Sequence, residues 1–195
     1  MFEKLNRRDE IVRVSSTLFV KHGYAATSIR DIAQQVGCTE AAIYYHFKDG
    51  KRALLRAVLE AVLPLLMATF DSIRGAKTLG DFVTLYSGQL DQVMTAQAGW
   101  FRWIIAEFAN FSEAEKNIFH EKHITLYNGL MATLVSYIPD QQQAHQSAWL
   151  IMCITIGYMQ LFYTLDLKSV DHARQVHLSD LISNALGLKG GSVTR

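Results

Sequence analysis

The chain has 195 residues, of which 50% are hydrophobic and 19% are charged, a balance typical of a soluble protein with one or two small domains. With only two cysteines the chain is not a disulfide-rich scaffold. The low count of two prolines and the scarcity of alternating Val- and Thr-rich runs favour helices. The net charge is only +1, but residues 1–60 carry +3 and residues 61–195 carry −2, so the N-terminal third is the better surface for an anionic partner. The charged N-terminus lacks the apolar stretch of a signal peptide, so we expect a cytoplasmic protein.

Two helices are predicted first in the chain. Apolar residues recur at helical spacing over 7–23 and stop at Gly23, which is a helix C-cap signal. The segment 27–36 places Ser28 three residues before Asp31, the spacing of a capping box. Both helices are therefore short and have defined ends.

A short third helix and a long fourth helix follow. The third covers 39–47 and has Thr39 as its predicted N-cap. After the turn "KDG", the fourth runs from 51 to about 74, and Pro64 is expected to kink it. Three helices within 47 residues form a small, tightly connected unit.

Residues 28–47 have the pattern of a helix-turn-helix. The small side chain of Ala33 lets the two helices cross closely. Gly37, four residues later, tolerates the positive φ that the turn requires. Ile43, six residues after the glycine, anchors the inner face of the third helix. The ordered set is a stronger signal than any single match.

The third helix presents a distinct outer face. At about 100° per residue, Ile43 and Phe47 share the inner face, and the residues opposite them can approach base edges or phosphates in a major groove. The predicted DNA contacts on and beside this face are Thr39, Glu40, Ala41, Tyr44, Tyr45, His46, Lys48 and Lys51. For His46, which lies nearest the inner face, packing within the domain is an equally good interpretation.

The stretch "TSIRDIAQQVGCTEAAIYYHFKDGKRALL" resembles the signature of TetR-type transcriptional regulators, and the preceding "LFVKHGYAATS" also fits. The close resemblance covers about residues 8–60 and implies a homodimer that binds a double-stranded DNA operator and responds to a small-molecule effector. It adds Thr27, Ser28 and Arg30 to the expected DNA contacts. Glu40 stands where many members have a basic or small residue, so their base preference cannot be transferred, and the turn "KDGK" is one residue longer than the common form.

The rest of the chain also reads as helical. Helices are expected over 79–97, 99–110, 113–138, 140–165 and 168–186. The predicted fold class is all-α, with a helix-turn-helix domain over 1–56 and a helical bundle for effector binding and dimerisation over 57–187. A glycine-rich tail over 188–195 is expected to be disordered.

Aromatic residues are concentrated over 99–127. Most are expected to fill the core, although some could line a pocket for a flat or apolar effector. The candidate pocket residues are Trp100, Trp103, Phe119, His123, Tyr127, Met152 and Tyr158. His120 and His123 are three residues apart, whereas the metalloprotease pattern needs four, so no metal is expected. The sequence contains no phosphate loop or nucleophile elbow, and we predict neither a cofactor nor an enzymatic activity.

Residues 141–165 carry no charge. They are long enough for a membrane helix, but they contain polar interruptions such as Gln160 and lack a flanking Lys/Arg cluster, so we predict no membrane contact. A charge-free helix of a soluble chain must cover all its faces, and packing against a second copy achieves this. The predicted dimer contacts are Leu150, Ile154, Leu161, Leu178 and Leu181.

Three functions compete at this stage. The first is a repressor released from a palindromic operator by a small-molecule effector. The second is an activator or a regulator without a ligand, because sequence does not separate repression from activation. The third is a small-molecule-binding or enzymatic helical bundle whose N-terminal unit is only structural, and it predicts no salt-dependent DNA affinity. The effector, the operator and the regulated genes are not encoded in any motif of the chain.

Overall fold

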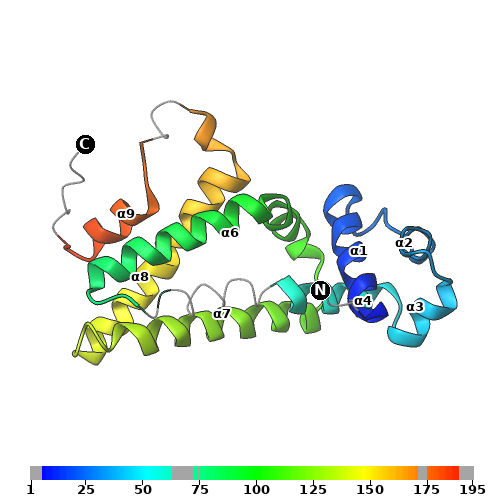
Figure 1. The fold of residues 1–195 in the computed structure, drawn as a ribbon, viewed down its shortest axis with the longest axis horizontal. Helices are drawn as coiled ribbons and strands as arrows, with labels where there is room; N and C mark the ends of the chain where they lie inside the picture. The colour runs from blue at the N-terminus through cyan, green and yellow to red at the C-terminus, as the bar shows by residue number, and fades with distance from the viewer. Residues whose placement is uncertain (1–5, 63–72, 74, 171–174, 189–195) are drawn as a thin grey trace. The chain divides into compact units, whose positions relative to one another are not determined.

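The computed structural model describes residues 6–62, 73, 75–170 and 175–188, and every regular element in them is helical (Figure 1). The predicted all-α fold class is confirmed. Backbone contacts divide the chain into two compact units, the first made of 1–64 and 103–121 and the second of 65–102 and 122–195. The predicted domain boundary at residue 56 leaves out residues 103–121, which pack with the N-terminal helices. The prediction could not include them because that contact is remote in sequence.

The first unit is built on the four N-terminal helices. They are α1 (Arg7–His22), α2 (Ile29–Val36), α3 (Glu40–His46) and α4 (Lys51–Val62). The apolar residues that share one face of each helix meet in a core where Ile11, Phe19, Ile32, Ile43 and Leu54 are fully buried. The same unit contains a 3-10 turn over Phe108–Asn110, the end of the helix before that turn and the start of the helix after it.

The second unit holds most of the remaining helices. They are α6 (Leu79–Glu107), α7 (Glu113–Leu134), α8 (Gln141–Met159), a π-helical turn (Gln160–Thr164), a 3-10 turn (Leu167–Ser169) and α9 (Leu178–Ala185). Large apolar side chains, including Phe82, Tyr86, Leu130 and Ile151, fill its core. The helices of this unit pack together because the apolar residues of each recur at helical spacing and share one face.

Two predicted breaks differ from the structure. The segments 79–97 and 99–110 form one helix to Glu107 with a kink at Gln97, where φ is −116° and ψ is 16°. The predicted helix 168–186 is wrong in its first half, since α9 begins only at Leu178. Leu178 and Ile182 are both buried and lie one helical turn apart, so the apolar pattern supports a helix only over these last turns. The Pro64 kink and the tail from 189 lie outside the described residues.

The segment Gln141–Thr164 has the length and apolar composition of a membrane span, but 44% of its window is buried inside the fold. A core helix of a soluble protein passes the same test. On α8 the buried positions include Ala144, Ala148, Ile151 and Thr155, one helical turn apart, and Trp149 on another face is exposed. The burial pattern is that of a helix with one face in the core of its own unit.

Candidate DNA-binding interface and ligand cavity

Helix α2 begins with a complete capping box. The backbone N–H of Asp31 donates to Ser28 Oγ at 3.1 Å, and the backbone N–H of Ser28 donates to a carboxylate oxygen of Asp31 at 2.9 Å. The Ser28 hydroxyl also donates to that oxygen at 2.6 Å. These hydrogen bonds, the hydroxyl first, lower the pKa of Asp31 below its usual range. The start of α2 is therefore fixed by its own side chains.

The turn between α2 and α3 has the geometry that the sequence predicts. Gly37 adopts the left-handed conformation with φ 71° and ψ 42°, which a residue without a Cβ enters readily. The backbone N–H of Cys38 donates to the carbonyl of Ala33 at 2.9 Å. Thr39 caps α3 by accepting from the backbone N–H of Ala42 at 3.2 Å. Ile43 is fully buried beneath α3, so the opposite side of the helix faces outward.

That outward side of α3 is uncovered. Tyr45 is 80% exposed and Tyr44 is 48% exposed, which are high values for aromatic side chains. Thr39, Glu40 and Ala41 are exposed at the start of the helix. The ring of Tyr44 lies against the backbone of Gly50, where a Cβ would be 3.1 Å from Tyr44 Cε1. Small groups at the start and phenol hydroxyls further along suit the base edges and phosphates of a groove.

The other predicted DNA contacts fall into two groups. Arg30 and Lys48 are exposed, and His46 is half-buried with its ring edge-on to Tyr45 at 5.1 Å between centroids. Thr27 is different, because its side chain is buried and its hydroxyl donates to the carbonyl of Gly23 at 2.8 Å. The Thr27 hydroxyl is used within the fold in this structure.

Lys51 holds the loop before α2. Its Nζ donates to the carbonyls of Tyr24 at 2.8 Å, Ala25 at 3.3 Å and Thr27 at 2.8 Å. These contacts occupy all three N–H donors of an ammonium group. The Nζ also lies 4.4 Å from the centroid of the Tyr24 ring. Burial, and then the positive charge of Arg52, lower the pKa of Lys51, and burial raises the pKa of Tyr24. The structure thus gives Lys51 an internal role that its position in sequence did not indicate.

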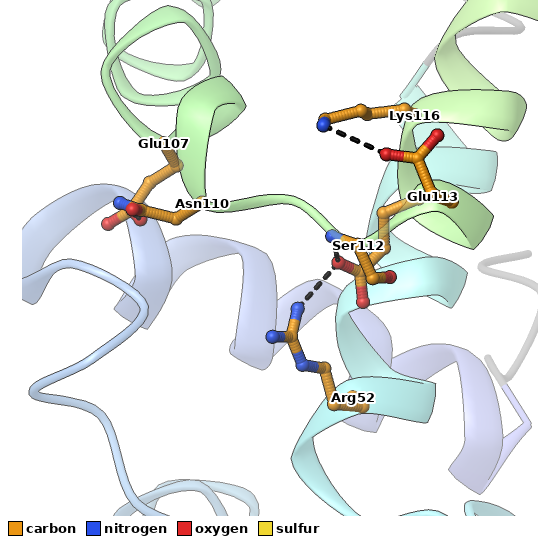
Figure 2. A network of polar contacts seen from close by, with 7 residues as sticks. Arg52, Glu107, Asn110, Ser112, Glu113 and Lys116 are labelled. Atoms are coloured by element: carbon orange, nitrogen blue, oxygen red, sulfur yellow. Dashed lines mark hydrogen bonds and ion pairs between the residues drawn. The ribbon is translucent and has the colours of Figure 1, made fainter.

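Two further contacts were missed from the sequence. The guanidinium of Arg8 lies 5.3 Å from the centroid of the Phe47 ring, which covers the end of α3. The guanidinium of Arg52 donates from Nη1 to Glu115 at 2.6 Å (Figure 2). The spacing of Ser112 and Glu115 is that of a capping box and was a usable signal for the start of α7. Nothing in the sequence indicates the partner of Glu115, because it is 63 residues away.

The second unit contains a small, partly enclosed cavity. It measures about 30 Å³, and the described side chains around it are Tyr86, Leu90, His123, Leu126, Met152, Thr155, Ile156 and Met159. Tyr86 is buried with its hydroxyl 3.5 Å from that of Thr155, and burial raises the pKa of Tyr86, so the phenol is neutral. A water needs at least about 10–15 Å³, so the cavity has room for one or two waters and no more. None of the described lining residues is Asp, Glu, Lys or Arg.

Comparison with known families matches residues 11–58 to the family described as bacterial regulatory proteins, tetR family. The match runs from the first turns of α1 into α4 and includes the whole helix-turn-helix. The helix-turn-helix segment of this chain is therefore of the tetR type. The transcriptional repressor KstR2 of Mycolicibacterium smegmatis is 34% identical over 73 residues, which are 37% of this chain and 35% of that relative. The regulator TtgR of Pseudomonas putida is 37% identical over 60 residues, 31% of this chain and 28% of TtgR. The chain thus matches about a third of the length of these relatives.

Solved structures extend the likeness of fold over most of the chain. A TetR transcriptional regulator from Legionella pneumophila has a TM-score of 0.72 at 18% identity and covers 94% of this chain and 99% of that one. The fatty acid degradation regulator FadR from Bacillus halodurans has a TM-score of 0.70 at 15% identity, with all of both chains covered. At these identities the likeness concerns the fold alone.

The predicted pocket residues lie in several separate places in the structure. His123 and Met152 line the cavity. Trp103 stacks on Phe19 in the first unit at 5.9 Å, and Phe119 packs against Phe108 there at 5.0 Å. The remaining three residues are elsewhere in the second unit. Trp100 is buried edge-on to Phe101, Tyr127 bonds His145, and Tyr158 stacks on Phe162 beside an open groove. The cavity residues on α6 and the hydroxyl of Thr155 were missed, since their spacing is that of any core helix.

The predicted dimer contacts differ in how far their side chains are exposed. Leu150, Leu161 and Leu181 are exposed large apolar side chains, and Ile154 is half-buried. Leu178 is buried within its own unit, 4% exposed, and its side chain is not accessible to a second copy. Among the described residues, no group of three His, Cys, Asp or Glu side chains could hold a metal ion.

Proposed function

We propose that this protein is a cytoplasmic, homodimeric transcriptional repressor that binds a palindromic operator through α3 and leaves it when a small molecule occupies the second unit. The observation that carries the proposal is the outward face of α3. Two exposed tyrosines, Tyr44 and Tyr45, stand on a helix whose start, turn and inner face are fixed by specific contacts. Exposed aromatic side chains on a rigid helix suit binding better than stability.

The names of the relatives support repression. KstR2 is named as a transcriptional repressor and TtgR as a transcriptional regulator, and both match the DNA-reading segment of this chain. In the proposed complex, Thr39, Glu40 and Ala41 approach base edges and Tyr45 bonds a flanking phosphate. Two such helices would occupy half-sites about 34–36 Å apart.

The proposed dimer uses the exposed apolar side of α8 with α9. Leu150 and Leu161 are exposed on or just after α8, and Leu181 is exposed on α9. A twofold axis would bring each such patch against its copy and remove apolar surface from water.

The proposed effector is an uncharged, largely apolar molecule. The described cavity walls offer hydroxyl and imidazole groups from Tyr86, Thr155 and His123 but no charged side chain to neutralise a carboxylate or phosphate. Because the cavity admits only water-sized groups, binding must displace flexible walls such as Met152 and Met159. A molecule that binds only the displaced form shifts the population toward it.

A selection experiment tests the proposal. Purified protein is mixed with a random-sequence duplex library, washed at high salt, and the retained DNA is sequenced. We expect a palindromic site that Tyr45→Ala no longer retains, whereas Tyr45→Phe, which loses only the hydroxyl, keeps the site at reduced affinity. A folded dimer that retains no palindrome would refute the proposal.

A further inference from the structure

Glu115 is a buried carboxylate that makes two separate interactions. It lies in the first turn of α7, and the backbone N–H of Ser112 donates to its Oε2 at 2.8 Å, which completes one half of a capping box. The guanidinium of Arg52 donates to the same oxygen at 2.6 Å (Figure 2). The other oxygen, Oε1, is buried and has no hydrogen-bond partner among the described residues. Capping α7 requires an acceptor at this position but does not require a negative charge.

Arg52 adjoins the residue that holds the loop before α2. Lys51 binds the carbonyls of Tyr24 and Thr27, and the next side chain in α4 binds Glu115. The guanidinium of Arg52 also lies 5.7 Å from the centroid of the Tyr24 ring. The first turn of α4 is thus attached on one side to the entrance of the helix-turn-helix and on the other to the start of α7.

This ion pair is a poor device for stability alone. The Glu115 side chain is 0% exposed and that of Arg52 is 46% exposed, so a fully desolvated charge faces a half-solvated one. A buried pair of this kind is often no more stabilising than an uncharged replacement, and an unpartnered oxygen adds to its cost. What an ion pair adds is a fixed, directional attachment.

We propose that Arg52 and Glu115 are positioning residues for DNA recognition. Their ion pair fixes the first turn of α4 and, through Lys51, the start of α2, in the geometry that reads a specific site. The inference rests on the proposed DNA-binding function. Loss of the charge lowers affinity for the specific site while the fold and the general attraction to DNA remain.

The test compares variants on two DNA probes. One probe is the duplex best retained by the wild type in the selection, and the other is a random-sequence duplex of the same length. The main variant is Glu115→Gln, whose amide oxygen still accepts from Ser112 because the capping box takes either residue. The matched control is Asp49→Asn, which also replaces a carboxylate by its amide but breaks only the exposed pair with Arg56.

We expect Glu115→Gln to keep its dimer and its melting temperature and to lose about tenfold or more in affinity for the selected site, with random-duplex affinity changed less than about twofold. Asp49→Asn should change both affinities in proportion. Should Glu115→Gln fail to fold, Arg52→Met combined with Glu115→Gln removes both charges together and is expected to show the same selective loss.

Two outcomes overturn the inference. Selected-site affinity within about twofold of the wild type in the folded variant shows that the charge positions nothing. A parallel change on both probes shows a general effect on DNA binding and not on the reading of a specific site. A wild type that does not discriminate between the two probes refutes the proposed function itself, and the inference with it.

Discussion

Replacing Lys51 with methionine retains most of the apolar stem but removes the three hydrogen bonds from Nζ to the loop before α2. The bonds to Tyr24 and Thr27 are short and part-buried, and each is worth about 1 kcal/mol net once water can replace part of it. The bond to Ala25 is longer and exposed, so we assign it nothing. The cation–π contact with Tyr24 adds about 0.5 kcal/mol at a site open to solvent. The expected loss in the free energy of unfolding is about 2.5 kcal/mol.

Thermal unfolding followed by circular dichroism measures this loss. For a chain of this size about 2.5 kcal/mol corresponds to a fall in melting temperature of about 5–10 °C. Lys48→Met is the matched control, because Lys48 is exposed and its loss removes the same charge from the same turn. We expect the control to stay within about 0.5 kcal/mol of the wild type. Equal melting temperatures for the two variants would refute the structural role of Lys51.

Three further predictions follow from the described contacts. The pKa of Asp31 is lowered in the folded state, so ionised Asp31 stabilises the fold at pH values above the usual carboxyl range. This contribution disappears as the pH falls through the folded-state pKa. In denaturant titrations from about pH 5 to pH 2, Asp31→Asn should therefore lose less of its free energy of unfolding than the wild type. Gly50→Ala should cost about 1–2 kcal/mol and lower operator affinity, because φ is +57° and the new Cβ would meet the Tyr44 ring at 3.1 Å; unchanged melting and binding would contradict it. Leu150→Arg should sediment as a monomer, whereas Ile124→Arg, at another exposed apolar residue, should remain a dimer; two dimers would argue against the proposed interface.

The helix-turn-helix was predictable because every signal that defines it is local. Ser28 and Asp31 cap α2 from three residues apart, and Gly37 takes the positive φ that its position requires. Thr39 caps α3 in the same way. Helix periodicity then fixes which side of α3 faces outward. None of these steps needs a contact between residues more than about one turn apart.

The sequence could not assign the side chains whose partners are remote. Lys51 reaches carbonyls 24 to 27 residues away, and Arg52 reaches a carboxylate 63 residues away. A cation beside a predicted reading helix suits a phosphate and a buried acceptor equally well, so composition alone does not decide between them. The same limit applies to the aromatic residues over 99–127, where core packing and a ligand cavity produce the same spacing.

The distinction between free and internally bound cations sets the expected salt dependence of DNA binding. Lys51 and Arg52 are held by the fold, and Arg56 pairs with Asp49 at 2.6 Å. Arg30 and Lys48 are exposed beside the reading helix and make no ion pair among the described residues.

Two phosphate contacts from each protomer of a dimer correspond to a slope of log K against log salt concentration of about −3 to −4. Fluorescence anisotropy on the selected duplex at a series of salt concentrations measures that slope. Lys48→Met should make the slope shallower by about 2, because each protomer loses one phosphate contact, and Lys51→Met should leave it unchanged. A slope of about −5 or steeper, or equal changes in the two variants, would mean that Lys51 turns from its carbonyls to the phosphates when DNA binds.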